Sequence, residues 1–574
     1  MHLARLNPAT PLPTRLGTLP RPLAVADAVA YRAIFALQAE GRMAAADRLV
    51  RDLKDPMLMG HVLAQRYLHP TAYVTTYAEL RDWLDAYADH PDAPRIYDLA
   101  LRKKGRDDPL PPNPIAGFLA GSGQELIEEM PIAYPGPSDR PTAATGRVRA
   151  WLAKVRALVG RDRPSAAAKL LDAPAARLAD TVERDIARWY VARGYFANRK
   201  DTQSYRFAAI AADRSGHVEP RLHWTAGLAA WRLGDYETAG RHFGLLAESE
   251  TTAEDVAAGA FWAARAYLRI RQPERHRRYL AQAAGMGDCF YSLLAQALVG
   301  DRIRFDWRED ALQDGMLRLL SGQPGALRAM ALGQVGEAER AEAEIRKLAA
   351  RAKPNLTQAL AALAETLRLP AAQMRVAQRL RIQDGHSHDG ALYPVPPWSP
   401  LGGFDVDRAL LFALVRAESG FDPLAKSHAG AHGVMQILPA TAAAMAKRRG
   451  LPYAGEADLL DPVVNLTLGQ AYVRRLLDTG FIGGDLIKTA LAYNAGLKRM
   501  GDWAPRFDDI DDPLLYLESV PVPETRLYAK KVLSNIWAYQ TRLGLPVSSL
   551  NRLAEGKWPI YQDQDPVNPR YAAN

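Results

Sequence analysis

A chain of 574 residues is longer than one hydrophobic core usually supports, so two or three domains are expected. Hydrophobic residues make up 48% and charged residues 24%, a composition that excludes a mostly disordered protein. The 73 Lys and Arg outnumber the 64 Asp and Glu, and the net charge of +9 favours an anionic partner such as a nucleic acid, a membrane surface or the cell wall.

Nucleic acid is the least favoured of these partners, because the chain has no run of like charge and no interleaving of aromatic and basic residues. Residues 1–26 are interrupted by prolines and predict an extended segment without the apolar stretch of a secretory signal. No run of about 18 apolar residues occurs, so no transmembrane helix is expected. The single cysteine, Cys289, excludes an intrachain disulfide and a thiolate metal site, and no cofactor is predicted.

Residues 27–380 are rich in Ala, Leu and Arg with apolar residues at helical spacing, which predicts an almost wholly helical region. Loops are expected at the proline-rich stretches Leu110–Pro114 and Pro131–Pro141. The stretch Trp231–Phe243 is similar to the core of a tetratricopeptide unit, and Ala260–Leu280 and Ala331–Leu348 repeat it more weakly. Stacked helical hairpins predict an α-superhelix, and an irregular helical domain is the alternative.

Residues 381–404 contain four prolines between Pro394 and Pro400 and predict an extended linker. His386 and His388 precede these prolines without a third metal ligand nearby, so two solvated side chains are favoured over a metal site. A second domain is expected at 405–545, followed by a C-terminal tail at 546–574.

Glu418 is the first candidate for chemistry. Residues 406–418 predict a helix that begins at Asp405 or Asp407 and ends at Gly420. Glu418 shares the apolar stripe of this helix with Leu411, Leu414 and Val415. Desolvation there would raise the pKa of the carboxyl group toward that of a general acid. A last-turn Glu bonded to a neighbouring loop is the alternative.

Two later segments carry polar groups beside glycines. In 430–441, Gly433 permits a tight turn, and the amide of Gln436 can donate and accept hydrogen bonds at a cleft wall. In 490–496, Tyr493 offers a ring for a sugar face and a hydroxyl for the reacting carboxylate.

Taken in order, these segments resemble the catalytic domain of the soluble lytic transglycosylases, the goose-lysozyme-like enzymes of peptidoglycan turnover. The matching positions are Glu418 and Ser419; Gly433, Val434, Met435 and Gln436; Ala492–Gly496; and Glu518, Ser519, Val520, Pro521, Glu524, Thr525 and Tyr528. Val434 replaces Leu and Val520 replaces Ile of the family's motifs. The resemblance covers about residues 400–545, and upstream it is architectural: in the family an α-superhelix precedes a lysozyme-like domain, so the whole chain is expected to be all-α.

The resemblance implies cleavage of the bond between N-acetylmuramic acid and N-acetylglucosamine without water. Glu418 would protonate the glycosidic oxygen and then take the proton from the C6 hydroxyl, which closes a 1,6-anhydro ring. Effective molarity would favour this internal nucleophile over water. The glycan strand is thus the expected partner, with cell-wall synthesis or division proteins on the helical region, and the periplasm is the expected location.

The resemblance also implies supporting roles. Tyr493 would orient Glu418, and Asn494 would hold the loop or the acetamido group. Ser419 and Gln436 would bond the glycan, and Met435 and Leu438 would pack the groove or simply the core. Glu524 is a second carboxylate near the cleft, with a salt bridge to Arg526 as the alternative. A hydrolytic muramidase on the same fold and a non-catalytic glycan-binding scaffold remain rival functions.

Overall fold

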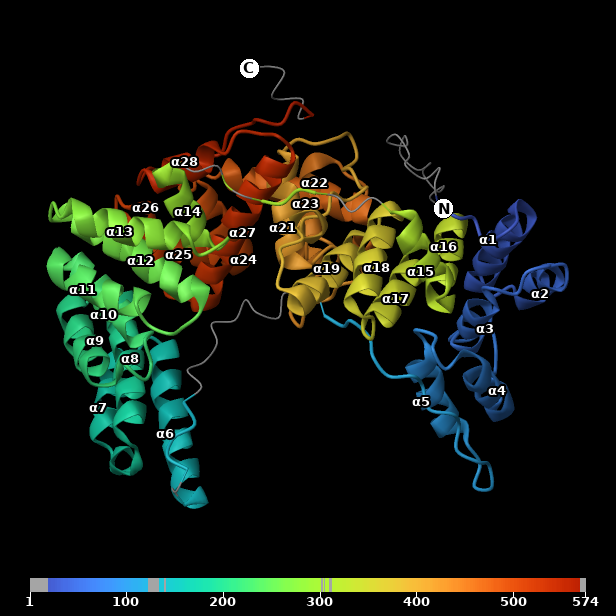
Figure 1. The fold of residues 1–574 in the computed structure, drawn as a ribbon, viewed down its shortest axis with the longest axis horizontal. Coiled ribbons are helices and arrows are strands. Elements are labelled where there is room, and N and C mark those ends of the chain that lie inside the picture. The colour runs from blue at the N-terminus through green and yellow to red at the C-terminus, as the bar shows by residue number, and fades with distance from the viewer. Residues whose placement is uncertain are drawn as a thin grey trace. The chain divides into compact units, whose positions relative to one another are not determined.

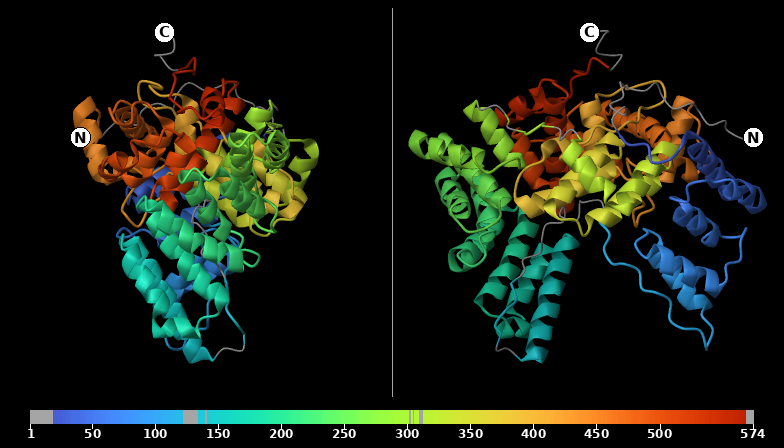
Figure 2. Two further views of the ribbon diagram at one scale, coloured as in Figure 1. Left: turned by 90° about the vertical axis from the view of Figure 1, so that its left-hand side faces the viewer. Right: turned by 45° about the vertical axis from the view of Figure 1, so that its right-hand side comes forward.

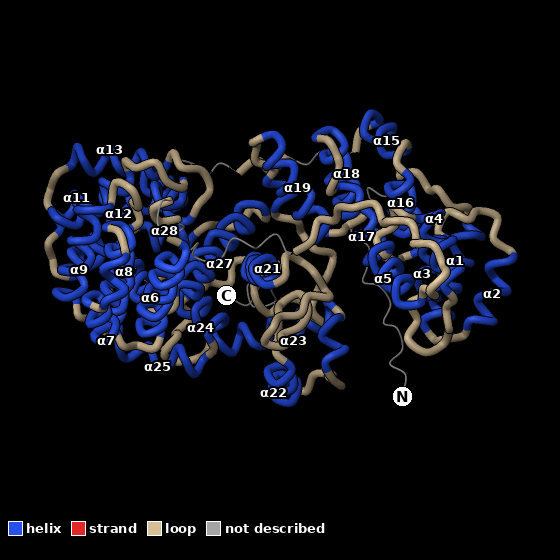
Figure 3. The backbone as a smooth tube through the Cα atoms, turned by 90° about the horizontal axis from the view of Figure 1, so that it is seen from below, coloured by secondary structure: helices blue, strands red, loops and turns tan. Residues whose placement is uncertain are grey.

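The computed structural model describes residues 19–121, 134–138, 141–300, 303, 305–308 and 312–567. Within these ranges the chain is built of helices and contains no strand (Figure 3). The β-type pairing found there is limited to isolated bridges, such as those that join His432 to Lys426 and to Ile437. The prediction of an all-α fold is confirmed. No described helix is long and apolar enough to span a bilayer.

Two compact units divide the chain: one comprises Met1–Gln124, Asp306–Trp398 and Ser419–Pro423, and the other comprises Glu125–Phe305, Ser399–Glu418 and Leu424–Asn574. Each compact unit is made of separate stretches of the chain. The predicted domain boundaries at residues 27, 381, 405 and 546 are therefore not tested by this division and stay predictions.

The helices of the first unit are α1 (Val25–Ala39), α2 (Met43–Arg51), α3 (Met59–Tyr67), α4 (Tyr77–Tyr87), α5 (Ala93–Lys103), α15 (Asp314–Ser321), α16 (Pro324–Val335), α17 (Ala338–Ala349), α18 (Pro354–Thr366), α19 (Pro370–Asp384) and α20 (Asp389–Leu392). Those of the second unit are α6 (Thr142–Gly160), α7 (Pro164–Lys169), α8 (Thr181–Ala197), α9 (Asp201–Ser215), α10 (Leu222–Arg232), α11 (Tyr236–Ala247), α12 (Ala253–Arg269), α13 (Pro273–Ala284), α14 (Phe290–Val299), α21 (Arg408–Glu418), α22 (Pro439–Arg449), α23 (Pro462–Leu477), α24 (Leu486–Ala495), α25 (Leu497–Phe507), α26 (Pro513–Ser519), α27 (Pro523–Arg542) and α28 (Ser548–Ala554).

Helices α8 to α13 form a row of antiparallel hairpins (Figure 1), with α6 beside α8 (Figure 2). The tetratricopeptide-like stretch is the hairpin of α10 and α11, and Gly234 turns the chain between them with φ of +77°. Gly227 lets α10 approach α11 closely, because a Cβ there would lie 2.5 Å from the ring of Phe243. The stretch Ala260–Leu280 likewise falls on the hairpin of α12 and α13.

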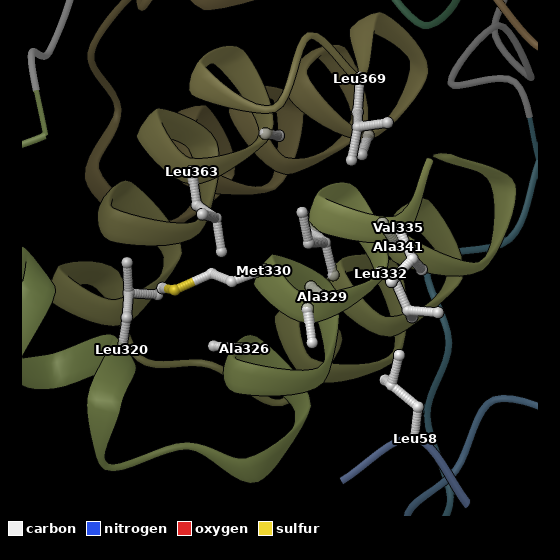
Figure 4. Packing of buried hydrophobic residues seen from close by; sticks show 14 of the residues in the cluster. Leu58, Leu320, Ala326, Ala329, Met330, Leu332, Val335, Ala341, Leu363 and Leu369 are labelled. Atoms are coloured by element: carbon white, nitrogen blue, oxygen red, sulfur yellow. The ribbon is translucent and has the colours of Figure 1, made fainter. Parts of the chain in front are cut away.

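The first unit contains the third predicted hairpin, Ala331–Leu348, as helices α16 and α17. Its core gathers α16, α17 and α18 around small and aliphatic side chains, and Leu320, Met330 and Leu363 point toward one another (Figure 4). Leu110–Pro114 is a loop, as predicted, and the described residues of the second stretch, 134–138 and 141, are also outside any helix, whereas 131–133, 139 and 140 lie outside the described residues.

The predicted linker is less extended than its prolines suggest. Helix α19 continues to Asp384, and the single turn α20 forms before the first proline, Pro394. His388 is not simply solvated: its Nε2 lies 2.8 Å from a carboxylate oxygen of Asp384. Chain beyond Pro394 is irregular up to α21.

The C-terminal segment packs against the start of α21. Asp565 is fully buried, and its carboxylate accepts hydrogen bonds from Arg408 Nε at 2.7 Å and from the Arg408 backbone at 3.2 Å. One residue earlier, the backbone N–H of Gln564 donates to Asp407 at 2.9 Å. These bonds fix the first turn of α21, whose last residue is Glu418.

We expect Asp565→Ala to destabilise the second unit by about 2–3 kcal/mol, because it leaves the half-buried guanidinium of Arg408 without its carboxylate. A drop of several degrees in the melting temperature of the full chain would report this loss. The control is Glu555→Ala, which breaks the exposed pair with Lys557 and should leave the melting temperature within about 1 °C. Equal melting of both variants would contradict this role of Asp565.

Candidate active site

Glu418 is the last residue of α21 and contacts α27, a helix that begins more than 100 residues later. The hydroxyl of Tyr528 on α27 donates to Glu418 Oε1 at 2.5 Å. Desolvation by burial raises the pKa of Glu418 to about 7, against the opposing effects of the Tyr528 hydrogen bond and the charge of Lys531. Among the described residues, no second carboxylate contacts this group. The site therefore offers one acid whose two protonation states are both populated near neutral pH.

The contact between α21 and α27 continues along one face of α27. About two turns beyond Tyr528, the amide of Asn535 accepts a hydrogen bond from Arg416 at 2.8 Å and donates to the Ala413 carbonyl at 3.3 Å. Lys531 lies between Tyr528 and Asn535 at helical spacing, and so on the face that α27 turns toward α21.

Burial lowers the pKa of Lys531 to about 7, and the charge of Arg416 adds to this effect while Glu418 opposes it. Lys531 was not among the residues predicted from sequence, and Tyr528 appeared there only as part of a motif. Their spacing of three residues would place them on one face of a helix, but it does not say which helix that face contacts.

The segment around Gly433 forms a tight turn that the site depends on. Gly433 has φ of +74°, and a Cβ there would lie 2.1 Å from the Leu459 carbonyl oxygen, so only glycine fits. Asn465 on α23 holds the same turn by accepting from the Met435 backbone at 2.8 Å. The Gln436 side-chain N–H donates to the carbonyls of Ala425 and Gly433, both at 2.9 Å. The amide predicted to bond glycan thus stabilises its own loop.

Helix α24 brings Tyr493 and Asn494 to this turn. Asp485 caps the helix by accepting from the Lys488 backbone at 2.7 Å. At the other end, the Tyr493 hydroxyl donates to the Met435 carbonyl at 2.7 Å, and Asn494 Oδ1 accepts from Thr525 of α27 at 2.7 Å. Burial raises the pKa of the Tyr493 phenol, with the charge of Glu418 as the next cause. Tyr493 is therefore near Glu418, but its hydroxyl bonds the turn, and Tyr528 bonds the carboxylate.

The remaining predicted residues differ in exposure. Ser419 and Met435 are completely buried, whereas Leu438 is 44% exposed. Glu524 is exposed at the start of α27. The alternative salt bridge from Glu524 to Arg526 is not found among the described residues, because Arg526 faces Glu518 instead, at 3.8 Å.

Glu518 joins α26 to two other helices. Its carboxylate is 3% exposed and lies 2.5 Å both from the hydroxyl of Tyr291 on α14 and from Lys530 Nζ on α27. Although burial opposes ionisation, Lys530 and Arg526 hold the pKa of Glu518 below its ordinary value. This motif residue thus connects the helical hairpins to the helix that carries Tyr528.

One group outside the site has the composition of a metal site. His61, His90 and Glu344 of the first unit are buried, with donor atoms within 4.8 Å of one another. Both oxygens of Glu344 are already bonded, by Arg328 Nε at 2.6 Å and a second Arg328 nitrogen at 2.9 Å, and by His61 at 2.8 Å. The guanidinium supplies the positive charge that a metal would bring, so we interpret the group as an ion-pair network.

Comparisons with known proteins identify the region around this site. Residues 401–512 match the family described as Transglycosylase SLT domain. A putative soluble lytic murein transglycosylase of Haemophilus influenzae is 37% identical over 143 residues, or 24% of this chain and 23% of that protein. The soluble lytic murein transglycosylase of Escherichia coli K12 is 34% identical over 143 residues, or 25% and 22% of the two chains. The match thus spans less than a quarter of these relatives.

Solved structures extend the likeness in fold. The 70 kDa soluble lytic transglycosylase of Escherichia coli superposes with a TM-score of 0.56 at 18% identity, covering 90% of this chain and 97% of that one. An inactive variant of the lytic transglycosylase of Pseudomonas aeruginosa gives 0.54 at 20% identity, covering 91% and 87%. At these identities the likeness concerns the fold alone.

We expect Lys531→Met to raise the pKa of Glu418 by about one unit, because it removes a positive charge that favours the carboxylate. Loss of the protonated acid would then occur at higher pH. The measurement is the upper limb of the pH profile for clearing a peptidoglycan suspension, which should move upward.

Lys531→Arg fixes a full positive charge at this position and should hold the limb at or below its wild-type pH, and Tyr97→Phe on α5 serves as a control for handling. An unchanged limb in Lys531→Met would show that Lys531 does not act on Glu418, whatever the change in maximal rate.

Proposed function

We propose that this chain, whose residues 401–512 match the Transglycosylase SLT domain, is a lytic transglycosylase of murein that uses Glu418 as its acid and then its base. The proposal takes residues 405–545 as the catalytic domain and 27–380 as the preceding superhelix. The single observation that carries it is the solitary desolvated carboxylate of Glu418, bonded by Tyr528.

A pKa near 7 suits both halves of such a reaction. The protonated form of Glu418 donates to the glycosidic oxygen as the bond from N-acetylmuramic acid breaks, and an oxocarbenium-like state or the 2-acetamido group carries the developing charge. The resulting carboxylate then removes the proton of the C6 hydroxyl, whose oxygen attacks C1 and closes the 1,6-anhydro ring. Atoms balance without water, and Glu418 regains its proton.

Ordinary glycosidases place a second carboxylate about 5–10 Å from the first, to activate water or to form a covalent intermediate. The motifs supply two further carboxylates, Glu518 and Glu524. Glu518 forms an ion pair with Lys530, and Glu524 lies at the solvent-exposed start of α27. This favours the intramolecular nucleophile over the hydrolytic muramidase.

The neighbouring residues have supporting roles in this proposal. Tyr528 holds the carboxylate and stabilises its charge, and Lys531 limits the rise in its pKa. Tyr493, Met435 and Gln436 maintain the turn that forms the wall beside Glu418, and Asn494 links that wall to α27 through Thr525. Leu438 is exposed enough to contact a sugar face. The reaction places the protein where murein lies, and we propose the periplasm and a role in cell-wall turnover.

We expect Glu418→Gln to abolish cleavage of purified peptidoglycan while sparing its binding, because the amide fills the same space but donates no labile proton. The measurements are release of soluble muropeptides and cosedimentation with insoluble peptidoglycan. Glu555→Gln, far along the chain and exposed, is the matched control. Cleavage that persists in Glu418→Gln would remove Glu418 from the mechanism.

The same variant should also change stability in a pH-dependent manner. Since the folded-state pKa of Glu418 is raised from 4.5 to about 7, the wild type loses stability as the pH rises through that range. Relative to wild type, Glu418→Gln should gain about 3 kcal/mol at pH 8 and nothing at pH 4. Chemical unfolding of both proteins at the two pH values measures this difference, and a parallel offset at both would contradict it.

Product mass separates the rival activities. Transglycosylation yields muropeptides one water lighter than those of hydrolysis, with no new reducing ends. Mass spectrometry of a complete digest should therefore show anhydro ends, and reducing ends in their place would establish the muramidase.

A further inference from the structure

Helix α6 concentrates positive charge at one end of the row of hairpins, where it packs on α7 and α8 (Figure 1). The segment 142–163, which is α6 and the three residues after it, contains one acidic residue, Asp162, and six basic residues. This excess amounts to more than half of the net charge of +9 of the whole chain. All six basic side chains are exposed, and none forms an ion pair with a described residue. They are Arg147, Arg149, Lys154, Arg156, Arg161 and Arg163.

Helical periodicity arranges the basic residues of α6 in two rows. Arg147 and Lys154 are seven residues apart, and so are Arg149 and Arg156. Because seven residues make nearly two turns, the members of each pair are aligned along the helix axis. Arg147 and Arg149 are two residues apart and therefore lie on nearly opposite sides of the helix. Other residues separate the charges in the sequence, so the rows form no run of like charge.

The inner face of α6, between the two rows, belongs to the core. Val148, Trp151 and Val155 are buried there and pack with Ala187 and Val191 of α8. Trp151 is the aromatic residue of α6, and its side chain is 5% exposed. The helix therefore offers no aromatic ring to a base or a sugar.

The outer face of α6, between the same rows, is smooth. Its exposed residues are small, namely Gly146, Ala150, Ala153 and Ala157. No large apolar side chain of α6 is exposed. Contact through this face would thus be electrostatic, without insertion of apolar groups into a partner.

An anionic lipid bilayer matches this face better than an anionic polymer does. A single convex helix without exposed aromatic rings lacks the groove and the stacking platforms with which proteins hold a nucleic acid strand. A bilayer presents phosphate groups across a plane, so the long side chains of both rows can reach them at once. Each Lys or Arg close to such a surface adds to the attraction, which falls off within a Debye length.

We propose that α6 binds the surface of bilayers that contain anionic phospholipid. The small residues of the outer face let the helix approach the headgroups closely, and the basic side chains on its two flanks contact the phosphates. The contact is peripheral and reversible by salt. It uses none of the residues that the proposed function assigns to the site, and so it goes beyond that function.

Vesicle binding tests this surface directly. The full chain is sedimented with vesicles of phosphatidylethanolamine and phosphatidylglycerol, in a ratio of about three to one, or with vesicles of phosphatidylcholine alone. At about 0.1 M salt we expect the anionic vesicles to bind at least about tenfold more tightly. At about 0.5 M salt the protein should be released, because screening shortens the range of the attraction.

Variants of α6 assign the binding to its charges. Arg147→Gln/Arg149→Gln/Lys154→Gln should weaken binding to the anionic vesicles at least about tenfold. Glutamine favours helix about as well as arginine and lysine do, so the melting temperature should stay unchanged. Arg147→Lys/Arg149→Lys keeps the charge and should bind as the wild type does. Arg156 is left in place because it also lines a cavity within the unit.

The matched control is Arg102→Gln/Lys103→Gln/Arg277→Gln, which removes the same charge from exposed positions on α5 and α13. It should bind within about twofold of the wild type. Equal binding to both kinds of vesicle, or equal losses in the two triple variants, would overturn the proposal. So would α6-dependent binding to single-stranded DNA or to purified peptidoglycan without binding to vesicles. Glu418→Gln should bind vesicles normally, so a failure of the proposed function would leave this result standing.

Discussion

The carboxylate of Glu418 is held in surroundings that disfavour its charge, and the architecture around it makes this tolerable. Burial alone would push the pKa higher still, but the Tyr528 hydroxyl and the Lys531 ammonium oppose it and leave a value of about 7. Both opposing groups come from α27, so the balance depends on how α27 packs on α21. A shift of either helix would alter the pKa as well as the geometry, which ties the chemistry to the fold.

Several contacts secure that packing. Asp565 and Gln564 fix the start of α21, and Asn535 joins its last turns to α27. Glu518 anchors α27 to Tyr291 on α14 through Lys530. Phe290 of α14 also stacks on Trp537 of α27, with ring centres 5.5 Å apart. Within the second unit, α14 therefore supports α27, the helix whose Tyr528 bonds Glu418. This gives the helical region a structural role besides any docking of partners.

This arrangement also explains why the motif residues are of two kinds. Gly433, Gln436, Tyr493 and Glu518 form bonds within the protein and shape the wall, whereas Glu418 has a carboxylate that can exchange a proton near neutral pH.

Sequence by itself determined the helices, the hairpin at Gly234 and the position of Glu418 on an apolar stripe, because helical periodicity and turn residues act over a few positions. It assigned the orientation of Glu418 to Tyr493, but the tertiary structure gives that bond to Tyr528 and directs Tyr493 to the Met435 carbonyl. It left the segment after 546 as a tail, although Asp565 is buried against Arg408. The role of Lys531 was likewise not evident. Each of these depends on which faces of distant helices meet, and that is decided by packing across more than 100 residues of chain.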